Sequence, residues 1–127
     1  MSKHETWRTR KYWGSIGGLL IEEFVAVRRG KNQGQRLIDG VIILGEKTSI
    51  ATDKSISLEN KDIIVIQTKA KRLGMGVLGQ AYFSTLLLQS YKPRSIKSVI
   101  ICEKNDDVLK ELAASHQIEI VVIPLET

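Results

Sequence analysis

The chain has little of three residue types that anchor many small folds: one cysteine, two prolines and two histidines in 127 residues. A lone cysteine forms no disulfide within the chain, and His4 and His116 are too far apart in the sequence to predict a histidine metal site. Apolar runs such as 41–44 are four residues long, whereas a membrane helix needs about 18 or more. The first residues also lack the apolar core of a signal peptide. We therefore expect a cytoplasmic protein with no membrane segment.

The composition is that of an ordinary folded domain. Hydrophobic residues make up 43% of the chain and charged residues 26%, close to globular averages, so disorder and low complexity are not expected. A chain of this length buries enough surface to sustain one core without a disulfide or a structural metal. We expect a single domain over residues 1–127.

Acidic residues are scarce in the first three quarters of the chain. Residues 1–97 hold 17 Lys and Arg against 8 Asp and Glu, whereas residues 98–127 hold 2 against 6. Clustered cations bind polyanions by releasing condensed counterions, although they also form ordinary solvated faces. The residues that we expect to contact a nucleic acid are Arg28, Arg29, Lys31, Arg36, Lys71 and Arg72.

Hydrophobic periodicity predicts eight elements. Strands are expected over 19–27, 36–44, 62–70, 96–102 and 118–123, and helices over 6–13, 77–91 and 105–116, the last with Asn105 as its N-cap. The polar segment 47–61 is either a hairpin connection or a mobile excursion. The order α-β-β-β-α-β-α-β predicts an α/β fold in which a mixed central sheet is flanked by helices.

Polar residues interrupt two apolar strands. Asp39 stands within Ile38-Asp39-Gly40-Val41-Ile42, and Gln67 and Lys69 end the strand that begins with Ile63. Strand side chains alternate, so Gln67 and Lys69 point to the same face, and Asp39 lies opposite them if the two strands pair. A buried carboxylate needs hydrogen bonds, a cation or a metal.

This pattern resembles the PD-(D/E)xK nuclease superfamily, and most closely the catalytic domain of Mrr-type restriction endonucleases. The matching segments are Ile38-Asp39-Gly40-Val41-Ile42, then Val65-Ile66-Gln67-Thr68-Lys69-Ala70-Lys71-Arg72, with Gly79-Gln80-Ala81-Tyr82-Phe83 at the place of a helical glutamine. Ile38 replaces the proline of the superfamily name, and Gln67 replaces an acid. The resemblance implies a restriction-endonuclease-like fold and a metal-dependent endonuclease that hydrolyses phosphodiester bonds in DNA.

The resemblance also implies residue roles. Asp39, the amide oxygen of Gln67 and the backbone carbonyl of Thr68 are expected to bind Mg²⁺ or Mn²⁺, and Lys69 to orient the attacking water or stabilise developing charge. Gln80 and an acid from the first helix often join such a site, which suggests Glu5. Glu22 and Glu23 are alternatives on the first strand. Because neighbouring strand residues face opposite sides, only one should point inward, and Glu23 shares its face with Ile21 and Val25.

Each of these residues also has an ordinary structural explanation. Asp39 can accept bonds from the backbone, Arg36 or Lys69, and Glu5 can complement the helix dipole. Gln67 and Lys69 can reach solvent from a strand end. Gln80 can form hydrogen bonds with the unpaired backbone groups at the start of a helix. The alternative functions are a catalytically inactive nucleic-acid-binding module, a nuclease resembling Holliday-junction resolvases, and an unrelated α/β protein that acts by protein contacts. Cleavage of both strands of a duplex needs two active sites, so we expect a homodimer. We expect any sequence specificity to come from a separate partner.

Overall fold

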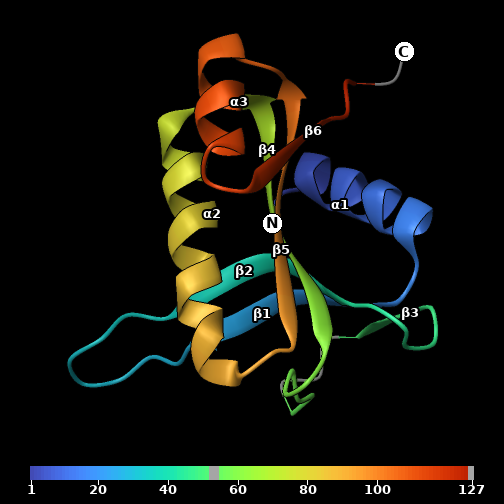
Figure 1. The fold of residues 1–127 in the computed structure, drawn as a ribbon, viewed down its shortest axis with the longest axis vertical. Coiled ribbons are helices and arrows are strands. Elements are labelled where there is room, and N and C mark those ends of the chain that lie inside the picture. Colours follow the sequence, from blue (N-terminus) through green and yellow to red (C-terminus); the bar gives the residue numbers. More distant parts are fainter. Residues whose placement is uncertain (52–54, 126–127) are drawn as a thin grey trace.

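The computed structural model describes residues 1–51 and 55–125 (Figure 1). Its elements are α1 (Lys3–Ile16), β1 (Leu19–Val27), β2 (Arg36–Ile43), β3 (Ser49–Ala51), β4 (Asp62–Arg72), α2 (Met75–Leu88), the short 3-10 helix η1 (Gln89–Tyr91), β5 (Ser95–Lys104), α3 (Asp107–Ala114) and β6 (Ile118–Val122). The predicted segment 47–61 therefore includes β3, and its residues 52–54 lie outside the described residues.

The described strands form one mixed sheet of six in the order β3-β1-β2-β4-β5-β6. β1 and β2 are antiparallel, as are β2 and β4. β4, β5 and β6 run parallel, joined by α2 and α3, and β3 runs parallel to β1. The chain is therefore an α/β protein with a mixed central sheet, as the sequence predicts.

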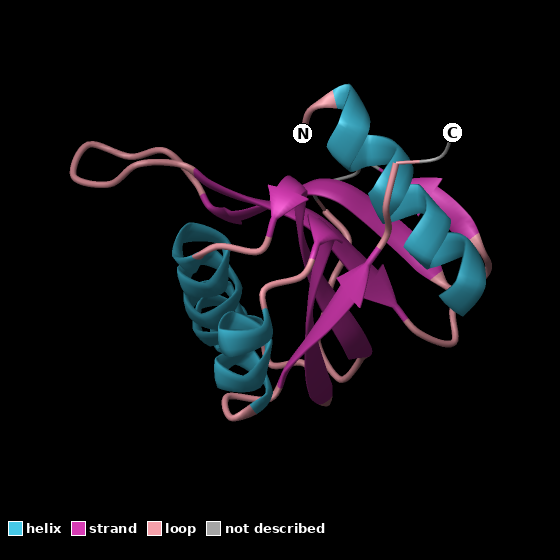
Figure 2. Ribbon diagram, turned by 90° about the horizontal axis from the view of Figure 1, so that it is seen from above, coloured by secondary structure: helices cyan, strands magenta, loops and turns pink. Residues whose placement is uncertain are grey.

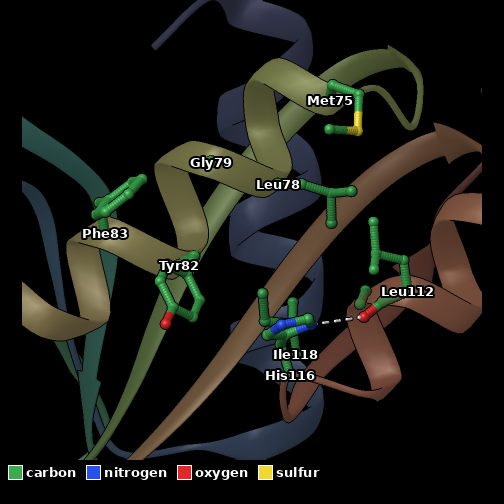
Figure 3. A pocket seen from close by; sticks show the side chains of 9 residues that line it. Met75, Leu78, Gly79, Tyr82, Phe83, Leu112, His116 and Ile118 are labelled. Atoms are coloured by element: carbon green, nitrogen blue, oxygen red, sulfur yellow. Dashed lines mark hydrogen bonds between the residues drawn. The ribbon is translucent and has the colours of Figure 1, made fainter.

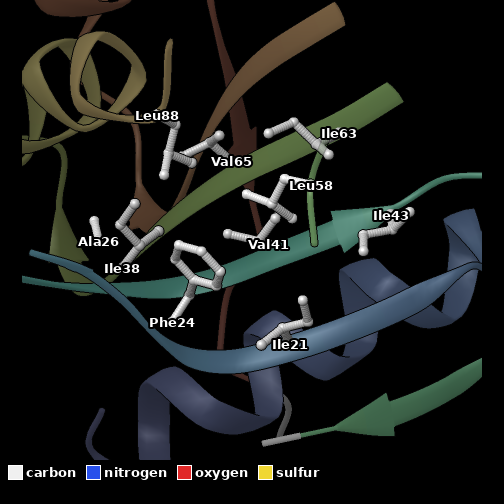
Figure 4. Packing of buried hydrophobic residues seen from close by; sticks show 10 residues of the cluster. All are labelled: Ile21, Phe24, Ala26, Ile38, Val41, Ile43, Leu58, Ile63, Val65 and Leu88. Atoms are coloured by element: carbon white, nitrogen blue, oxygen red, sulfur yellow. The ribbon is translucent and has the colours of Figure 1, made fainter. Parts of the chain in front are cut away.

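The helices lie in two layers, with the sheet between them (Figure 2). On one face, Tyr12 of α1 packs with Leu20, Ile64 and Ile101. On the other face, Val77 of α2 and Ala113 of α3 form a cluster with Ile100 of β5 and other residues. A third cluster lies at the end of the sheet next to Leu88 and includes Phe24, Val41 and Ile63 (Figure 4). Alternate residues of the central strands thus serve cores on both faces.

All predicted helices and strands are present, with shifted ends. α1 begins at Lys3, before the predicted start, because Ser2 and Glu5 form a capping box. The expected N-cap Asn105 is wrong: Asp106 is the N-cap, and its extended backbone lets its carboxylate accept a bond from the Leu109 amide at 3.0 Å. No helix in the described residues is both long and apolar enough to span a bilayer.

Candidate active site

β2 and β4 pair over only part of their lengths. Their register runs from Ile43↔Ile63 to Gly40↔Ile66, after which β4 continues alongside β5. The strands therefore separate at Asp39 and Gln67. Beyond this point the backbone of β4 no longer hydrogen-bonds to the backbone of β2. The Thr68 amide donates instead to Asp39 Oδ2 at 2.8 Å. The two predicted strands are adjacent as expected, and Asp39 contacts the residue between Gln67 and Lys69.

Asp39 is half-buried, and its surroundings are acidic. Burial is the main cause that raises the pKa of Asp39 from 3.8 to about 6, and the charges of Glu5 and Glu23 raise it further. The bond from the Thr68 amide and the amino group of Met1 act in the opposite direction. Glu5 from α1, Glu23 from β1 and Asp39 from β2 form what we call the acidic cluster. A cation placed here would favour ionised Asp39.

The strand geometry at the two glutamates differs from the predicted alternation. Glu23 has a positive φ of 53°, and Ile21 and Phe24, three residues apart, lie in the same core cluster. Alternation is therefore interrupted between them. Glu22 binds Arg10 of α1 through two bonds of 2.9 Å, and Glu23 binds the amino group of Met1. Only one of the two glutamates is buried, as expected, but it is Glu22 and not the favoured Glu23, whose side chain is 41% exposed.

Specific contacts hold α1 over the acidic cluster. Thr9 Oγ1 lies 2.7 Å from Thr68 Oγ1, and both residues are buried. Gly40 permits this approach, since a Cβ there would lie 3.3 Å from the Thr9 methyl carbon and 3.2 Å from Leu20 Cδ1. Glu5 keeps its capping role, with Oε1 accepting from the Ser2 amide at 3.0 Å. Its charge nevertheless acts on Asp39, so both interpretations of Glu5 have a geometric basis.

Gln67 and Lys69 lie on the opposite face of the sheet. They pair with Ile100 and Cys102 of β5, which belong to the core beneath α2 and α3. Gln67 is buried and donates to Ser84 Oγ at 2.9 Å, while Lys69 is exposed. The prediction that they share a face agrees with this register. From the point where β2 and β4 stop pairing, the side chains of Gln67 and Asp39 thus extend in different directions.

A cavity of about 430 Å³ adjoins Gln67 and is lined by Gln80, Arg36 and Ser84, among other residues. The structure therefore gathers the predicted residues into two groups, one on each side of the sheet: the acidic cluster with Thr68, and Gln67 with Gln80. The sequence analysis missed the partners Thr9 and Ser84. Ser84 could have been identified from the sequence, because it falls on the apolar face of the helix over 77–91, where a hydroxyl requires a hydrogen-bond partner.

The predicted nucleic-acid contacts are all exposed. Arg28, Arg29 and Lys31 lie in the loop between β1 and β2, a segment that extends well away from the body of the fold (Figures 1 and 2). We call residues 28–36 the basic arm. A bridge between Gly30 and Gln33, and a bond from Gln33 Nε2 to the Arg28 carbonyl at 2.9 Å, order the arm. Lys71 and Arg72 are exposed at the end of β4, where Arg72 also donates to the Asn105 carbonyl.

Arg8 belongs to a basic run in the sequence but is not a surface cation. Its side chain is 0% exposed and donates to the carbonyls of Ile123 at 2.7 Å and His4 at 2.9 Å, and to Glu103 at 3.3 Å. A buried guanidinium is tolerated only with such partners. Arg8 is thus part of the scaffold that fixes α1.

The donor set near Asp39 suits a hard cation that keeps part of its water shell. No group of three His, Cys, Asp or Glu side chains has metal-binding geometry in residues 1–51 and 55–125. Mg²⁺, however, is usually held by one or two carboxylates and completes its octahedron with water and substrate phosphates. A half-buried carboxylate in an acidic surrounding meets that requirement. Of the predicted ligands, Asp39 has the carboxylate whose pKa responds to two further carboxylates, Glu5 and Glu23.

Comparison of the chain with protein-family models, with curated proteins and with solved structures gives no match.

Proposed function

We propose that the protein is a metal-dependent endonuclease that hydrolyses phosphodiester bonds in DNA, with a restriction-endonuclease-like fold. The observation that carries the proposal is the convergence of Glu5, Glu23 and Asp39, from three elements, at the point where β2 and β4 separate. Asp39 is half-buried, and the charges of Glu5 and Glu23 disfavour its ionised form, which the amino group of Met1 offsets in part. In this proposal a metal ion supplies the further positive charge that favours ionised Asp39.

The roles of the residues follow from their positions. Asp39 binds the metal, and the Thr68 amide fixes its carboxylate at 2.8 Å. Asp39 would hold Mg²⁺ or Mn²⁺, whose chemistry when bound would be to lower the pKa of a water and to polarise the phosphate. Lys69 is exposed two residues beyond Gln67, on the other face of the sheet from Asp39, so the proposal requires its long side chain to reach around the end of β4 to stabilise negative charge on the phosphate. Gln67 is bound to Ser84 and contributes its amide oxygen only if its side chain turns.

The basic arm supports DNA as the substrate. Arg28, Arg29, Lys31 and Arg36 are exposed on a projecting segment that leads directly into the strand of Asp39. Cations on such an extension contact phosphates along the backbone and give binding that weakens steeply with salt. The arm would therefore position a duplex so that one phosphate meets the acidic cluster.

Nicking of supercoiled plasmid in Mg²⁺ and in Mn²⁺ tests the proposal. We expect Asp39→Ala and Lys69→Ala each to lower the nicking rate at least about 100-fold, because even indirect partners of a metal ligand account for 10- to 100-fold. Lys110→Ala, which removes an exposed lysine from α3, is the matched control and should nick normally. Circular dichroism establishes that every variant is folded.

The same experiment separates the second candidate, an inactive DNA-binding module, which the basic arm also supports. If the wild type binds duplex DNA with strong salt dependence but cleaves no plasmid, four-way junction or single strand with either metal, the binding module replaces the nuclease. Preferential cleavage of the four-way junction would instead indicate a resolvase-like enzyme. Absence of both binding and cleavage would overturn the nucleic-acid proposal.

A further inference from the structure

α2 carries a surface unlike the rest of the molecule. Charged residues make up 26% of the chain, yet none occurs in the 19 residues from 73 to 91. A helix that is apolar on all sides normally lies in an interior. Here only one side of α2 packs on the sheet, through Val77, Leu78, Ala81, Ser84 and Leu88.

The other side of α2 exposes large apolar side chains to solvent. Met75 is 65% exposed, Phe83 63% and Leu86 51%, and Tyr82, Leu87 and neighbouring Leu112 of α3 are also exposed. We call these six residues the α2 surface. Since a large side chain presents roughly 150–250 Å² when whole, their exposed fractions correspond to on the order of 600 Å². That is the upper limit for a typical monomer and approaches the roughly 800 Å² that one partner contributes to a standard interface.

The α2 surface has both a projection and a recess. Gly79 lies at its centre, and a Cβ at this position would meet nothing within 4 Å. A cavity of about 220 Å³ lies beside Gly79, with walls that include Leu78, Tyr82, Leu112 and Ile118. In Figure 3, Tyr82 points towards His116, whereas Phe83 points away from it. Phe83 stands one helical turn after Gly79, at the rim of this cavity, and is 63% exposed.

We infer that the α2 surface is the interface of a two-fold symmetric dimer of this chain, in which two copies of α2 pack antiparallel. A two-fold axis near residue 81 places Phe83 of each copy against Gly79 of the other, as an isologous interface requires. Leu86 and Leu87 then lie towards Met75 and the apolar cavity of the second copy. This geometry favours a second copy of the chain as the occupant, because the projecting Phe83 and the recess at Gly79 are four residues apart on one helix without charges.

Charge also favours a second copy over contact elsewhere. The chain has a net charge of +5, so two copies repel unless they meet where neither carries cations. The α2 surface is such a place, and the basic arm remains outside it. The inference does not rest on the proposed nuclease activity, because Asp39 takes no part in the α2 surface.

Sedimentation velocity of the full chain at about 50 µM, where even an interface of micromolar affinity associates, measures the oligomeric state. We expect the wild type to be a dimer, and Gly79→Glu to be a folded monomer because a charge then occupies the recess. Gly14→Glu is the matched control and should remain a dimer: Gly14 is also a helix-interior glycine with nothing within 4 Å of its Cβ position, but it lies in α1.

The register can be tested by exchanging projection and recess. Gly79→Phe alone should be monomeric, and the double variant Gly79→Phe/Phe83→Gly should dimerise again. Asp39→Ala should stay dimeric whether or not it cleaves DNA, so the outcome for the interface is separate from that for the nuclease. A monomeric wild type, or a dimer that persists in both Gly79→Glu and Gly79→Phe, would overturn the inference.

Discussion

The two faces of the sheet bury different kinds of side chain. On the α1 face, charged groups are buried or half-buried and each meets a defined partner: Arg8 with Ile123 and Glu103, and Glu22 with Arg10. On the α2 face, the covering helix has no charge at all, and α2 packs through apolar side chains. A buried charge tolerates few arrangements, whereas an apolar contact needs mainly the right shape and volume.

This difference explains where each proposed activity lies. A metal site needs carboxylates held in place, and the α1 face supplies the hydrogen bonds that hold them. An interface between copies needs exposed apolar area without fixed charges, and the α2 surface supplies it. The two properties can therefore be altered separately, and the following substitutions test that separation.

The largest effect on stability is expected from Arg8→Ala. Removing the guanidinium leaves the Ile123 carbonyl and Glu103 without their partner, so the free energy of unfolding should fall by about 3–5 kcal/mol. Leu88→Ala, at an equally buried position at the end of α2, should lose about 2–5 kcal/mol by cavity formation alone. Urea unfolding measures both.

Arg29→Ala is the control for Arg8, because Arg29 is exposed on the basic arm; its effect should stay within about 0.5 kcal/mol. If Arg8→Ala matched this small change, burial of the guanidinium would contribute little, and the contrast between the two faces would be lost. Arg8→Lys gives a second reading, since it keeps the charge but not the planar set of donors.

Asp39→Asn should make the protein more stable while it removes the proposed activity. Burial raises the pKa of Asp39 to about 6, above the 3.8 of an unperturbed carboxyl, so ionisation favours the unfolded chain. That penalty is present above about pH 6 and vanishes below about pH 4. The variant should therefore exceed the wild type by about 1–3 kcal/mol at pH 8 and equal it at pH 4.

Chemical denaturation at both pH values, without divalent cations, measures this difference. Added Mg²⁺ should then stabilise the wild type and leave Asp39→Asn unchanged, because binding to the native state alone shifts the unfolding equilibrium. A variant that is less stable than the wild type at pH 8 would show that the Asp39 carboxylate is a structural acceptor and not a strained one.

The smallest effect is expected from the exposed pair Lys97–Glu119, whose atoms lie 3.4 Å apart with about half of each side chain in solvent. Lys97→Gln should change the free energy of unfolding by less than about 0.5 kcal/mol, since water and salt screen such pairs. The measurement is the same urea titration at low and high salt. A loss comparable with that of Arg8→Ala would mean that exposure does not separate the two classes of charge.

The fold could be predicted to the extent that local patterns determine it. Apolar strands bounded by glycine, and the change to helical period after Gly74, are visible in the sequence and locate the main elements. Strand β3 was not predicted, because its three residues carry no pattern and pair only with β1. The N-cap of α3 was misplaced by one residue, since Asn105 and Asp106 are equally suitable caps until backbone geometry selects one.

The site was predictable in part. Asp39 beside the Gln67–Lys69 strand follows from alternation and strand pairing, and both strands are neighbours. The opposite orientations of Asp39 and Gln67 do not follow, because they depend on where β2 and β4 separate. The interruption of alternation at Glu23 does not follow either, because its positive φ depends on tertiary packing. The burial of Arg8 does not follow from the sequence, because a sequence does not show which face of α1 meets the backbone after β6.

The contact between Arg8 and Ile123 joins residues 115 positions apart, and this spacing has a consequence for how the chain is made. The ribosome releases α1 first, when the carbonyl that will accept from Arg8 has not been synthesised. A guanidinium cannot enter the interior without its acceptors, so α1, and Glu5 with it, must wait undocked. We therefore expect the acidic cluster to be completed only after Ile123 has emerged from the ribosome.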